Sequence, residues 1–291
     1  MRKMANVMMT LALSAACVAG AAVTATAAEF DASTDISVLS REDGSGTRGA
    51  FIELFGIEQK DADGNKVDMT TEEAAITNST SVMMTSVAND LYALGYISLG
   101  SLDDTVKAVK IDGAAPSVET VKDGSYKVVR PFNIVVKEDA LTPVDQDFIN
   151  YILSADGQAV VSENGYISID AEDAFESDQS EGKIVVGGSS SVSPVMEKLI
   201  EAYQTVNPNA EIELQTTDST TGVSSTLEGT YNIGMASREL KDTEEGVTAI
   251  KIADDGIAVI VNNENPVEEL TSEQVLSVYT GETLTWEELA E

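Results

Sequence analysis

The sequence contains no histidine and a single cysteine, Cys17, among its 291 residues. One cysteine cannot form a disulfide within the chain. Without histidine the protein has neither a Ser-His-Asp triad nor the Cys/His ligand set of most zinc sites. These two absences exclude much of the known enzyme chemistry, including hydrolysis by a histidine-activated serine or cysteine.

Positive charge is also scarce. The chain has 17 Lys and Arg against 50 Asp and Glu, which gives a formal net charge of −33. Such a chain is repelled by nucleic acid and by anionic membrane surfaces, so we expect neither as a partner. Its length and its 43% share of hydrophobic residues predict a globular protein of about two domains.

Residues 1–28 have the pattern of an export signal. A basic start is followed by an apolar run over 7–23 and by an Ala-Thr-Ala cleavage site at 25–27. The run is short and rich in small residues, which favours a cleaved signal over a transmembrane anchor. A loose lipobox ends at Cys17, so two alternatives stay open: a freely secreted protein and one that is lipid-anchored through Cys17. Either way we expect an extracytoplasmic protein.

Short apolar strands alternate with helical patterns in the first half of the remaining chain. We predict strands at 93–100 and 127–137, and one helix over 142–161 that starts on a Thr N-cap followed by Pro. A further helix is expected over 81–91, with these side chains facing inward: Val82, Ser86, Val87 and Leu91.

An acidic stretch at 171–182 has almost no apolar residues and predicts a linker. Beyond it the pattern restarts with the strand KIVVGG, and a doubly buried strand is expected at 255–262. The intervening helix places these residues on one face: Val192, Val195, Met196, Leu199, Ile200 and Tyr203. The alternation predicts an α/β protein with mixed, mostly parallel sheets.

Three turns rich in glycine, serine and threonine each open a helix, at 44–47, 189–191 and 219–222. Helix N-termini carry unpaired N–H groups and partial positive charge, and Ser and Thr add hydroxyl donors, so such turns suit anions. Each turn alone is explained by simple helix capping. The first also matches G-x-G-x-x-G. However, Arg-Glu-Asp at 41–43 separates it from the preceding strand, which argues against a dinucleotide site.

The stretches SREDGSGTRGAFIEL and VVGGSSSVSPVMEKLIEAY, with NIGMASREL downstream, closely resemble the phosphate-binding proteins of bacterial phosphate ABC transporters, which are periplasmic binding proteins of type II. The resemblance runs from Asp35 to Glu291 except for the acidic linker. It implies two α/β lobes joined by two crossing strands, with phosphate held in the cleft between them and lobe closure sensed by a membrane permease.

The two halves stand in the opposite order from that of the family, in which the GSSSV half precedes the REDGSGTR half. We therefore expect a circular permutation, with 171–182 joining the former termini. One lobe is then discontinuous, 31–130 plus 262–291, and the other is 131–261. The alternative is a fragment of a tandem array, which would form a domain-swapped dimer; permutation instead predicts a monomer.

The resemblance also implies the site. Phosphate is expected to be held by Arg41, Ser45, Gly46, Thr47, Ser190, Ser191 and Ser219, with Ser237 where some relatives have an aspartate that accepts the proton of HPO₄²⁻. Asp43 is expected to orient Arg41, and Asp218 is a second candidate acceptor. Arg238 is either a further cation or part of a surface ion pair with Glu239 or Asp242. No cofactor or metal is expected.

Two other functions remain as alternatives. The same fold could bind another oxyanion, such as sulfate, molybdate or a phosphonate, or act as a sensor uncoupled from transport, since a site made only of donors accepts sulfate as well as phosphate. A secreted phosphatase would need a serine or carboxylate mechanism for which the sequence has no motif.

Overall fold

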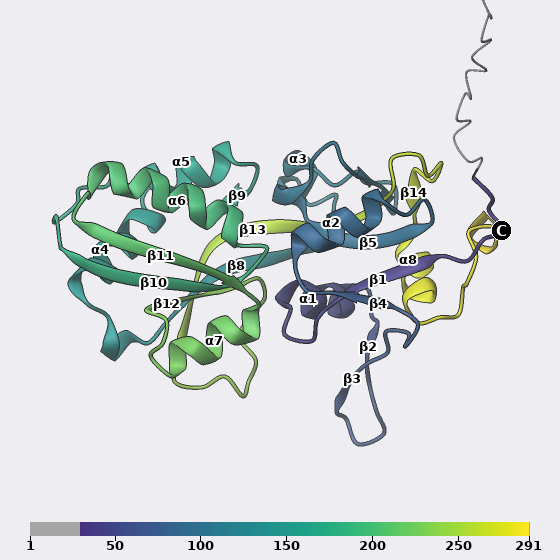
Figure 1. The fold of residues 1–291 in the computed structure, drawn as a ribbon, viewed down its shortest axis with the longest axis horizontal. Coiled ribbons are helices and arrows are strands. Elements are labelled where there is room, and N and C mark those ends of the chain that lie inside the picture. The colour runs from purple at the N-terminus through teal and green to yellow at the C-terminus, as the bar shows by residue number, and fades with distance from the viewer. Residues whose placement is uncertain (1–29, 291) are drawn as a thin grey trace, which may run out of the picture.

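The computed structural model describes residues 30–290 (Figure 1). The expected signal segment and Cys17 lie outside the described residues. None of the helices within residues 30–290 has the length and hydrophobicity needed to cross a bilayer. The chain forms two α/β lobes joined by two long strands, which confirms the predicted fold class.

The lobe that carries Ser190, called here the Ser190 lobe, is built on three parallel strands in the order β11-β10-β12. The strands are β10 (Gly182–Ser189), β11 (Ala210–Thr217) and β12 (Ile233–Ala236). The helices of this lobe are α4 (Pro143–Leu153), α5 (Ala155–Glu163), α6 (Ser193–Val206) and α7 (Ser219–Leu227).

The lobe that carries Arg41, called the Arg41 lobe, has β1 between two parallel neighbours. Its strands are β1 (Ser37–Arg41), β4 (Ala75–Thr77) and β5 (Ala93–Ser98), and its helices are α1 (Gly46–Leu54), α2 (Thr80–Ala88), α3 (Val118–Lys122) and α8 (Ser272–Tyr279). A hairpin of β2 (Glu58–Lys60) and β3 (Lys66–Asp68) projects from it (Figure 1). Short strands complete the fold: β6 (Lys107–Ala108), β7 (Lys110–Ile111), β9 (Ile167–Ser168) and β14 (Glu269–Leu270).

Two antiparallel strands, β8 (Val129–Val136) and β13 (Thr248–Val261), run between the lobes (Figure 1). The first part of β13 pairs with β8, and its last part pairs with β5 of the Arg41 lobe. Ala253 packs in the core of the Ser190 lobe, whereas Ile257 packs in the core of the Arg41 lobe. The second crossing therefore falls between these two residues, ahead of the boundary expected at 261/262.

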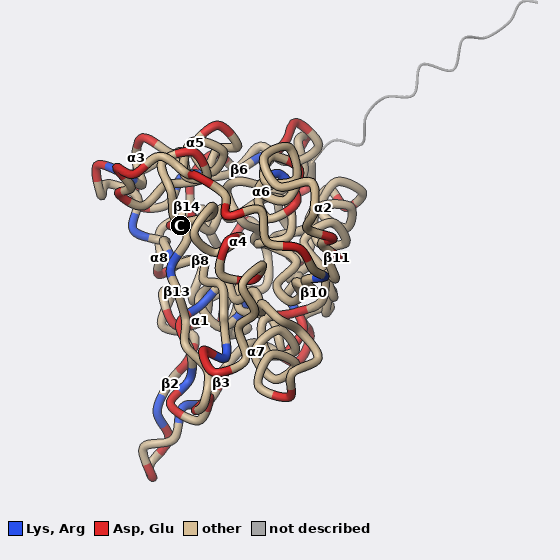
Figure 2. The backbone as a smooth tube through the Cα atoms, turned by 90° about the vertical axis from the view of Figure 1, so that its left-hand side faces the viewer, with Lys and Arg blue, Asp and Glu red and all other residues tan. Residues whose placement is uncertain are grey.

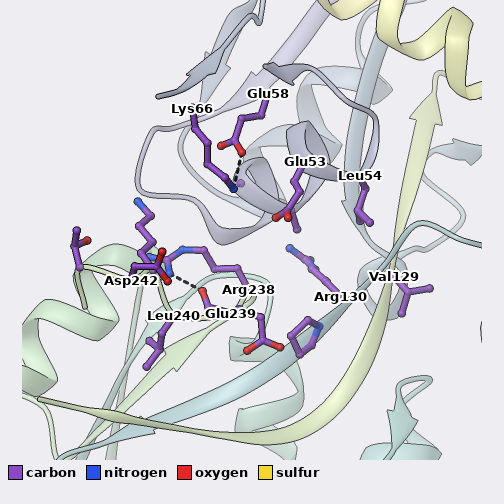
Figure 3. A pocket seen from close by; sticks show the side chains of 15 residues that line it. Glu53, Leu54, Glu58, Lys66, Val129, Arg130, Arg238, Glu239, Leu240 and Asp242 are labelled. Carbon is purple, nitrogen blue, oxygen red and sulfur yellow. Dashed lines mark hydrogen bonds and ion pairs between the residues drawn. The ribbon is translucent and has the colours of Figure 1, made fainter. Parts of the chain in front are cut away.

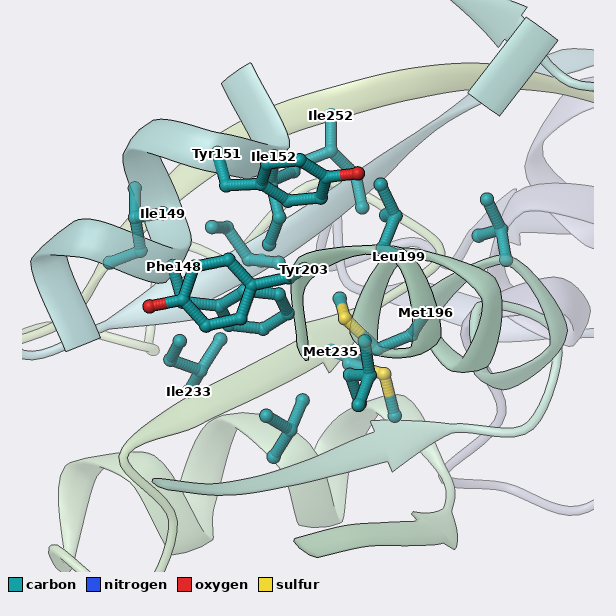
Figure 4. Close-up of a cluster of buried hydrophobic side chains, with 14 of the residues drawn as sticks. Phe148, Ile149, Tyr151, Ile152, Met196, Leu199, Tyr203, Ile233, Met235 and Ile252 are labelled. Atoms are coloured by element: carbon teal, nitrogen blue, oxygen red, sulfur yellow. The ribbon is translucent and has the colours of Figure 1, made fainter. Parts of the chain in front are cut away.

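The helix faces were predicted with mixed success. All six residues expected on the inner face of α6 are buried, and several of them pack with Phe148 and Tyr151 of α4 (Figure 4). In α2, Val87 is buried as expected, but Val82 is 43% exposed and Met83 is buried instead. The expected helix over 142–161 is two helices, because Ser154 ends α4 and caps α5 by accepting a hydrogen bond from Gly157 N.

The acidic linker has no regular structure over 171–181, as predicted, yet it is fixed to the Ser190 lobe. The Asp147 carboxylate accepts hydrogen bonds from Ser177 Oγ (2.7 Å) and Asp178 N (3.0 Å) of the linker. The same carboxylate accepts from Tyr203 OH (2.7 Å). Burial and this bond to Asp147 raise the pKa of the Tyr203 phenol, so Tyr203 remains a donor at neutral pH.

We predict that Tyr203→Phe lowers the free energy of unfolding by about 1.5–3 kcal/mol, because a buried carboxylate loses a hydrogen-bond donor. Urea unfolding followed by circular dichroism measures this loss. Tyr151→Phe is the matched control, since Tyr151 packs in the same aromatic cluster but its hydroxyl makes no hydrogen bond with residues 30–290. Equal losses in the two variants would contradict the role given to Asp147.

Candidate functional site

Four helix N-termini meet where the two lobes touch. The three turns singled out in the sequence open α1, α6 and α7, and a fourth turn ending at Thr80 opens α2. The Ser45 hydroxyl caps α1 by accepting from Arg48 N (3.2 Å), and the Ser79 hydroxyl caps α2. N-termini directed at one place combine their partial positive charges there, which favours an anion.

Side chains of the two lobes contact one another directly at this place. Thr47 Oγ1 lies 2.8 Å from Ser191 Oγ, and Arg41 Nη2 donates to Ser190 Oγ (3.0 Å). Thr80 Oγ1 lies 3.2 Å from Ser191 Oγ and 3.4 Å from Ser190 Oγ. All five residues are buried. Two turns about 145 residues apart in the sequence (|i−j| of 144 for Thr47 and Ser191) therefore lie face to face.

Two glycines allow this close approach. A Cβ on Gly46 would meet Ser219 Oγ and would lie 2.7 Å from Ser237 Oγ. A Cβ on Gly44 would meet Asp218 Oδ1. The main chain also bonds across the interface here, because Thr220 N donates to Gly44 O (3.1 Å). The glycines are thus required by the fit of one lobe against the other.

Arg41 has one guanidinium nitrogen without a partner. Its Nε and Nη2 each donate to the Glu42 carboxylate at 2.8 Å, and its side chain is 2% exposed. Nη1 is buried and has no hydrogen-bond partner among residues 30–290. Leaving a buried charged donor unpaired costs free energy, so this nitrogen marks a position where an anionic acceptor is favourable.

The prediction that Asp43 orients Arg41 is wrong. The Asp43 side chain is 99% exposed and pairs with Arg48 (3.0 Å), whereas Glu42 holds Arg41. Residues 43 and 44 form the turn into α1, which carries the Asp43 side chain away from the end of β1. Tyr96 supports the Arg41 main chain, since its hydroxyl accepts from Arg41 N (3.1 Å).

The serines expected from the Ser190 lobe lie together. Ser237 N donates to Ser219 Oγ (3.0 Å), and Ser189 Oγ donates to Ser237 Oγ (2.9 Å). Ser219 and Ser237 are both fully buried. The structure therefore brings all eight expected binding residues to one interface: Arg41, Ser45, Gly46, Thr47, Ser190, Ser191, Ser219 and Ser237.

Asp218, the second candidate proton acceptor, is engaged in capping. Its carboxylate accepts from Thr221 N (2.9 Å) and Thr221 Oγ1 (2.6 Å) at the start of α7. These bonds use both carboxylate oxygens for the helix terminus. Asp218 is therefore the N-cap of α7, and its role as an acceptor for the ligand stays a prediction, because each carboxylate oxygen keeps a further lone pair.

Arg238 pairs with neither Glu239 nor Asp242 side chains but with Glu244, in a bidentate arrangement at 2.7 and 2.8 Å. Burial acts to raise the pKa of Glu244, but hydrogen bonds from Arg238 and from Lys241 N outweigh it and leave that pKa lowered. Arg238 Nη2 also donates to Thr220 Oγ1 (3.2 Å). Arg238 is therefore a neutralised cation held within the Ser190 lobe, beside Thr220, whose hydroxyl donates to Gly44 O of the Arg41 lobe (3.2 Å).

Sequence reasoning missed Glu42 and Thr80. Glu42 and Asp43 are adjacent acids directly after Arg41, and no local pattern distinguishes which of the two pairs with it. Thr80 follows Asn78 and Ser79 directly ahead of an apolar helix, which is the same N-cap signal as in the other three turns. That signal was available in the sequence.

A groove of about 700 Å³ lies beside the site (Figure 3). It is lined by α1, by the β2–β3 hairpin and by the loop 238–243, and Arg130 points into it (Figure 3). Of the expected site residues only Arg238 lines it. Within residues 30–290 no group of three or more acidic, histidine or cysteine side chains is arranged to hold a metal ion.

Acidic residues are spread over the outer loops and helices (Figure 2). The hydroxyls and the guanidinium of the site are buried instead. Salt at physiological strength screens exposed charges beyond roughly 8 Å, whereas buried donors are screened much less. The local donors, rather than the net charge of −33, decide what this interface attracts.

Comparisons with known proteins agree with this geometry. The family model for the PBP superfamily domain matches residues 23–156 and 173–291. The phosphate-binding protein PstS 2 of Streptococcus agalactiae is 55% identical over 257 residues, which are 88% of each chain. The crystal structure of the phosphate-binding protein of a phosphate ABC transporter from Streptococcus pneumoniae is 45% identical with a TM-score of 0.69, and the match covers 88% of this chain and 99% of that one.

A more distant relative, the phosphate-binding protein PstS of Staphylococcus saprophyticus, is 33% identical over 123 residues, 39% of each chain. The family model and the streptococcal relatives each cover well over two thirds of the sequence. The chain therefore belongs to the PBP superfamily and, within it, to the family of phosphate-binding proteins of phosphate ABC transporters.

Proposed function

We propose that this protein is an extracytoplasmic receptor that captures inorganic phosphate between its two lobes and presents it to an ABC permease. The observation that carries the proposal is the unpaired Arg41 Nη1, buried where hydroxyls of both lobes meet. Phosphate supplies several acceptor oxygens to such a set of donors. The names of the streptococcal relatives support phosphate as the ligand.

The proposed ligands come from both lobes. The Arg41 lobe supplies the guanidinium of Arg41, the Gly46 amide and the hydroxyls of Ser45, Thr47 and, as an addition to the expected set, Thr80. The Ser190 lobe supplies Ser190, Ser191 and Ser219. Charge-assisted hydrogen bonds contribute about 1.5–3 kcal/mol each, while micromolar affinity requires about 8 kcal/mol. Several such bonds are enough for micromolar affinity even after the free-energy costs of desolvation and lobe closure are subtracted.

Binding without catalysis follows from the same donors. The site offers amides, hydroxyls and one guanidinium. The chain has no histidine to activate a nucleophile, and its single cysteine, Cys17, belongs to the expected signal segment. We therefore infer a receptor rather than a phosphatase, and a monomer, since both sides of the site come from one chain.

We also infer that the chain is circularly permuted relative to the common order of the family. The staphylococcal relative aligns over only 39% of each chain, as expected when one half can be matched in sequence order. The streptococcal relative aligns over 88% of each, which supports the same order of halves in both. The fixed linker over 171–181 supplies the connection that such a permutation requires.

Another oxyanion is a second candidate ligand because of Ser237. Among the side chains at the interface, Glu42 is engaged by Arg41 and Asp218 by Thr221. We assign the acceptor role for the proton of HPO₄²⁻ to the Ser237 hydroxyl, which stands where some relatives have an aspartate. A hydroxyl accepts this proton less strongly than a carboxylate does, so discrimination against sulfate depends on its orientation.

We predict that isothermal titration calorimetry on the mature chain gives phosphate binding at least about tenfold tighter than sulfate binding. The reason is that HPO₄²⁻ has an O–H group that can donate a hydrogen bond to Ser237 Oγ, whereas sulfate has none. Ser237→Ala should narrow this ratio toward one, while Ser224→Ala, in the exposed part of α7, should keep it. Equal affinity of the unsubstituted protein for both anions would remove the phosphate assignment.

The pairing of Arg41 with Glu42 predicts a second result. Glu42→Gln should lower the free energy of unfolding of the ligand-free protein by about 1.5–3 kcal/mol, since it weakens two bonds to a buried cation. Added phosphate should restore part of the loss by supplying a new counter-charge. Thermal unfolding with and without phosphate measures both effects.

Asp43→Asn is the matched control for Glu42→Gln. Its exposed carboxylate should contribute less than about 1 kcal/mol. A larger effect of Asp43→Asn than of Glu42→Gln would show that the expected pairing with Asp43, and not the observed one, holds in solution.

A further inference from the structure

A buried ion pair lies where the two strands cross between the lobes. Arg130 of β8 and Asp255 of β13 are register partners, and both side chains are 1% exposed. Arg130 Nε and Nη2 donate to Asp255 Oδ2 at 3.2 and 3.0 Å. Neither residue belongs to the anion-binding turns, so the function proposed above leaves this pair unexplained.

The Asp255 end of the pair is tied to the Arg41 lobe. Its Oδ1 accepts from Ser98 Oγ (2.9 Å) and from Gly100 N (3.4 Å), at and just beyond the end of β5. Ser98 is fully buried. The carboxylate is thereby fixed by donors from both the crossing strand β8 and the sheet of one lobe.

The Arg130 end is tied to the other lobe at the site itself. Arg130 Nη1 donates to the main-chain carbonyl of Ser237 (3.3 Å). Asn133, three residues further along β8, donates from Nδ2 to the next carbonyl, that of Arg238 (2.9 Å). Two side chains of one crossing strand therefore hold two successive carbonyls of the turn that follows β12.

That turn carries the Ser237 hydroxyl, which interacts with Ser189 and Ser219 of the site. A main chain held at the Ser237 carbonyl fixes the direction of the Cα–Cβ bond and so the position of the hydroxyl. The contacts form one continuous path from Ser98 through Asp255 and Arg130 to Ser237.

Buried ion pairs seldom stabilise a fold, because the desolvation of both charges offsets their attraction, and apolar replacements are often as stable. A contribution to stability alone therefore does not account for this one. An arginine does offer what an apolar residue cannot: a planar fork that binds a carboxylate on one side and a carbonyl on another.

We propose that Arg130, held by Asp255, is a positioning residue for the anion site: it fixes the Ser237 turn of one lobe relative to the end of β5 in the other. The proposal rests on the proposed function, because the positioned Ser237 hydroxyl is the group assigned to accept the hydrogen bond from the O–H of HPO₄²⁻. The crossing strands thereby serve as a support for specificity as well as a connection between lobes.

Two variants test the role. Arg130→Lys keeps the positive charge beside Asp255, but a single ammonium cannot reproduce the fork that also reaches the Ser237 carbonyl. Arg130→Met combined with Asp255→Asn removes both charges, leaves no unpaired buried ion, and keeps an amide oxygen for Ser98. We expect both to fold, because neither leaves an unpaired buried charge.

The measurement is calorimetric titration of each folded variant with inorganic phosphate and with sulfate. We expect phosphate binding to weaken about tenfold in both variants, while sulfate binding weakens less, so that the ratio of the two affinities falls. Tyr203→Phe serves as control: it removes a buried hydrogen bond of the same lobe and should lower the thermal midpoint with the affinity ratio unchanged.

The outcomes separate the two claims. If the unsubstituted protein binds no phosphate, the proposed function falls and the positioning role falls with it. If it binds phosphate but the ratio in both the lysine and the Met/Asn variants equals that of the unsubstituted protein, only the positioning role is overturned. If one variant fails to fold, the ratio in the other decides. A fall in the ratio matched by Tyr203→Phe would also overturn the role, because general destabilisation would then explain it.

Discussion

Everything at this interface depends on one buried guanidinium. Arg41 ends β1, is held on one side by Glu42, reaches Ser190 across the lobes, and keeps Nη1 without a partner among the described residues. A buried cation of this kind is costly unless an anion completes its hydrogen bonds. The four helix N-termini that converge here also favour negative charge. The interface of the folded protein therefore favours an anionic ligand.

The two-lobe architecture places donors on both sides of the position that favours an anion. Gly44 and Gly46 let the turn of one lobe approach the other more closely than any side chain would permit. Phosphate bound in this way would be enclosed by both lobes, and its affinity would be coupled to their closure. The acidic exterior does not oppose this, because the donors are buried and the outer charges are screened.

Local patterns in the sequence predicted the elements well where one residue decided the outcome. The Thr142 cap with Pro143 places the start of α4, and the spacing from Val192 to Tyr203 identifies the buried face of α6. Predictions failed where tertiary geometry decided. In α2, for example, the side chain that packs against Gly95 of β5 is Met83 and not the expected Val82.

At the site, too, local patterns were predictive and tertiary contacts were not. Turn chemistry and family resemblance together identified the residues that the structure gathers at the interface. They did not identify which acid holds Arg41, because the choice between Glu42 and Asp43 depends on the direction of the turn into α1. Nor could they reveal Arg130 with Asp255, whose pairing is set by the register of two strands about 125 residues apart (|i−j| of 125).

A crystal structure of the mature chain grown with phosphate tests the central claim most directly. The account predicts one phosphate between the lobes, with an oxygen bonded to Arg41 Nη1 and others bonded to hydroxyls or amides from both the 44–47 and the 189–191 turns. Phosphate bound to one lobe alone, or bound in the groove beside α1 with Arg41 Nη1 still unpaired, would contradict it.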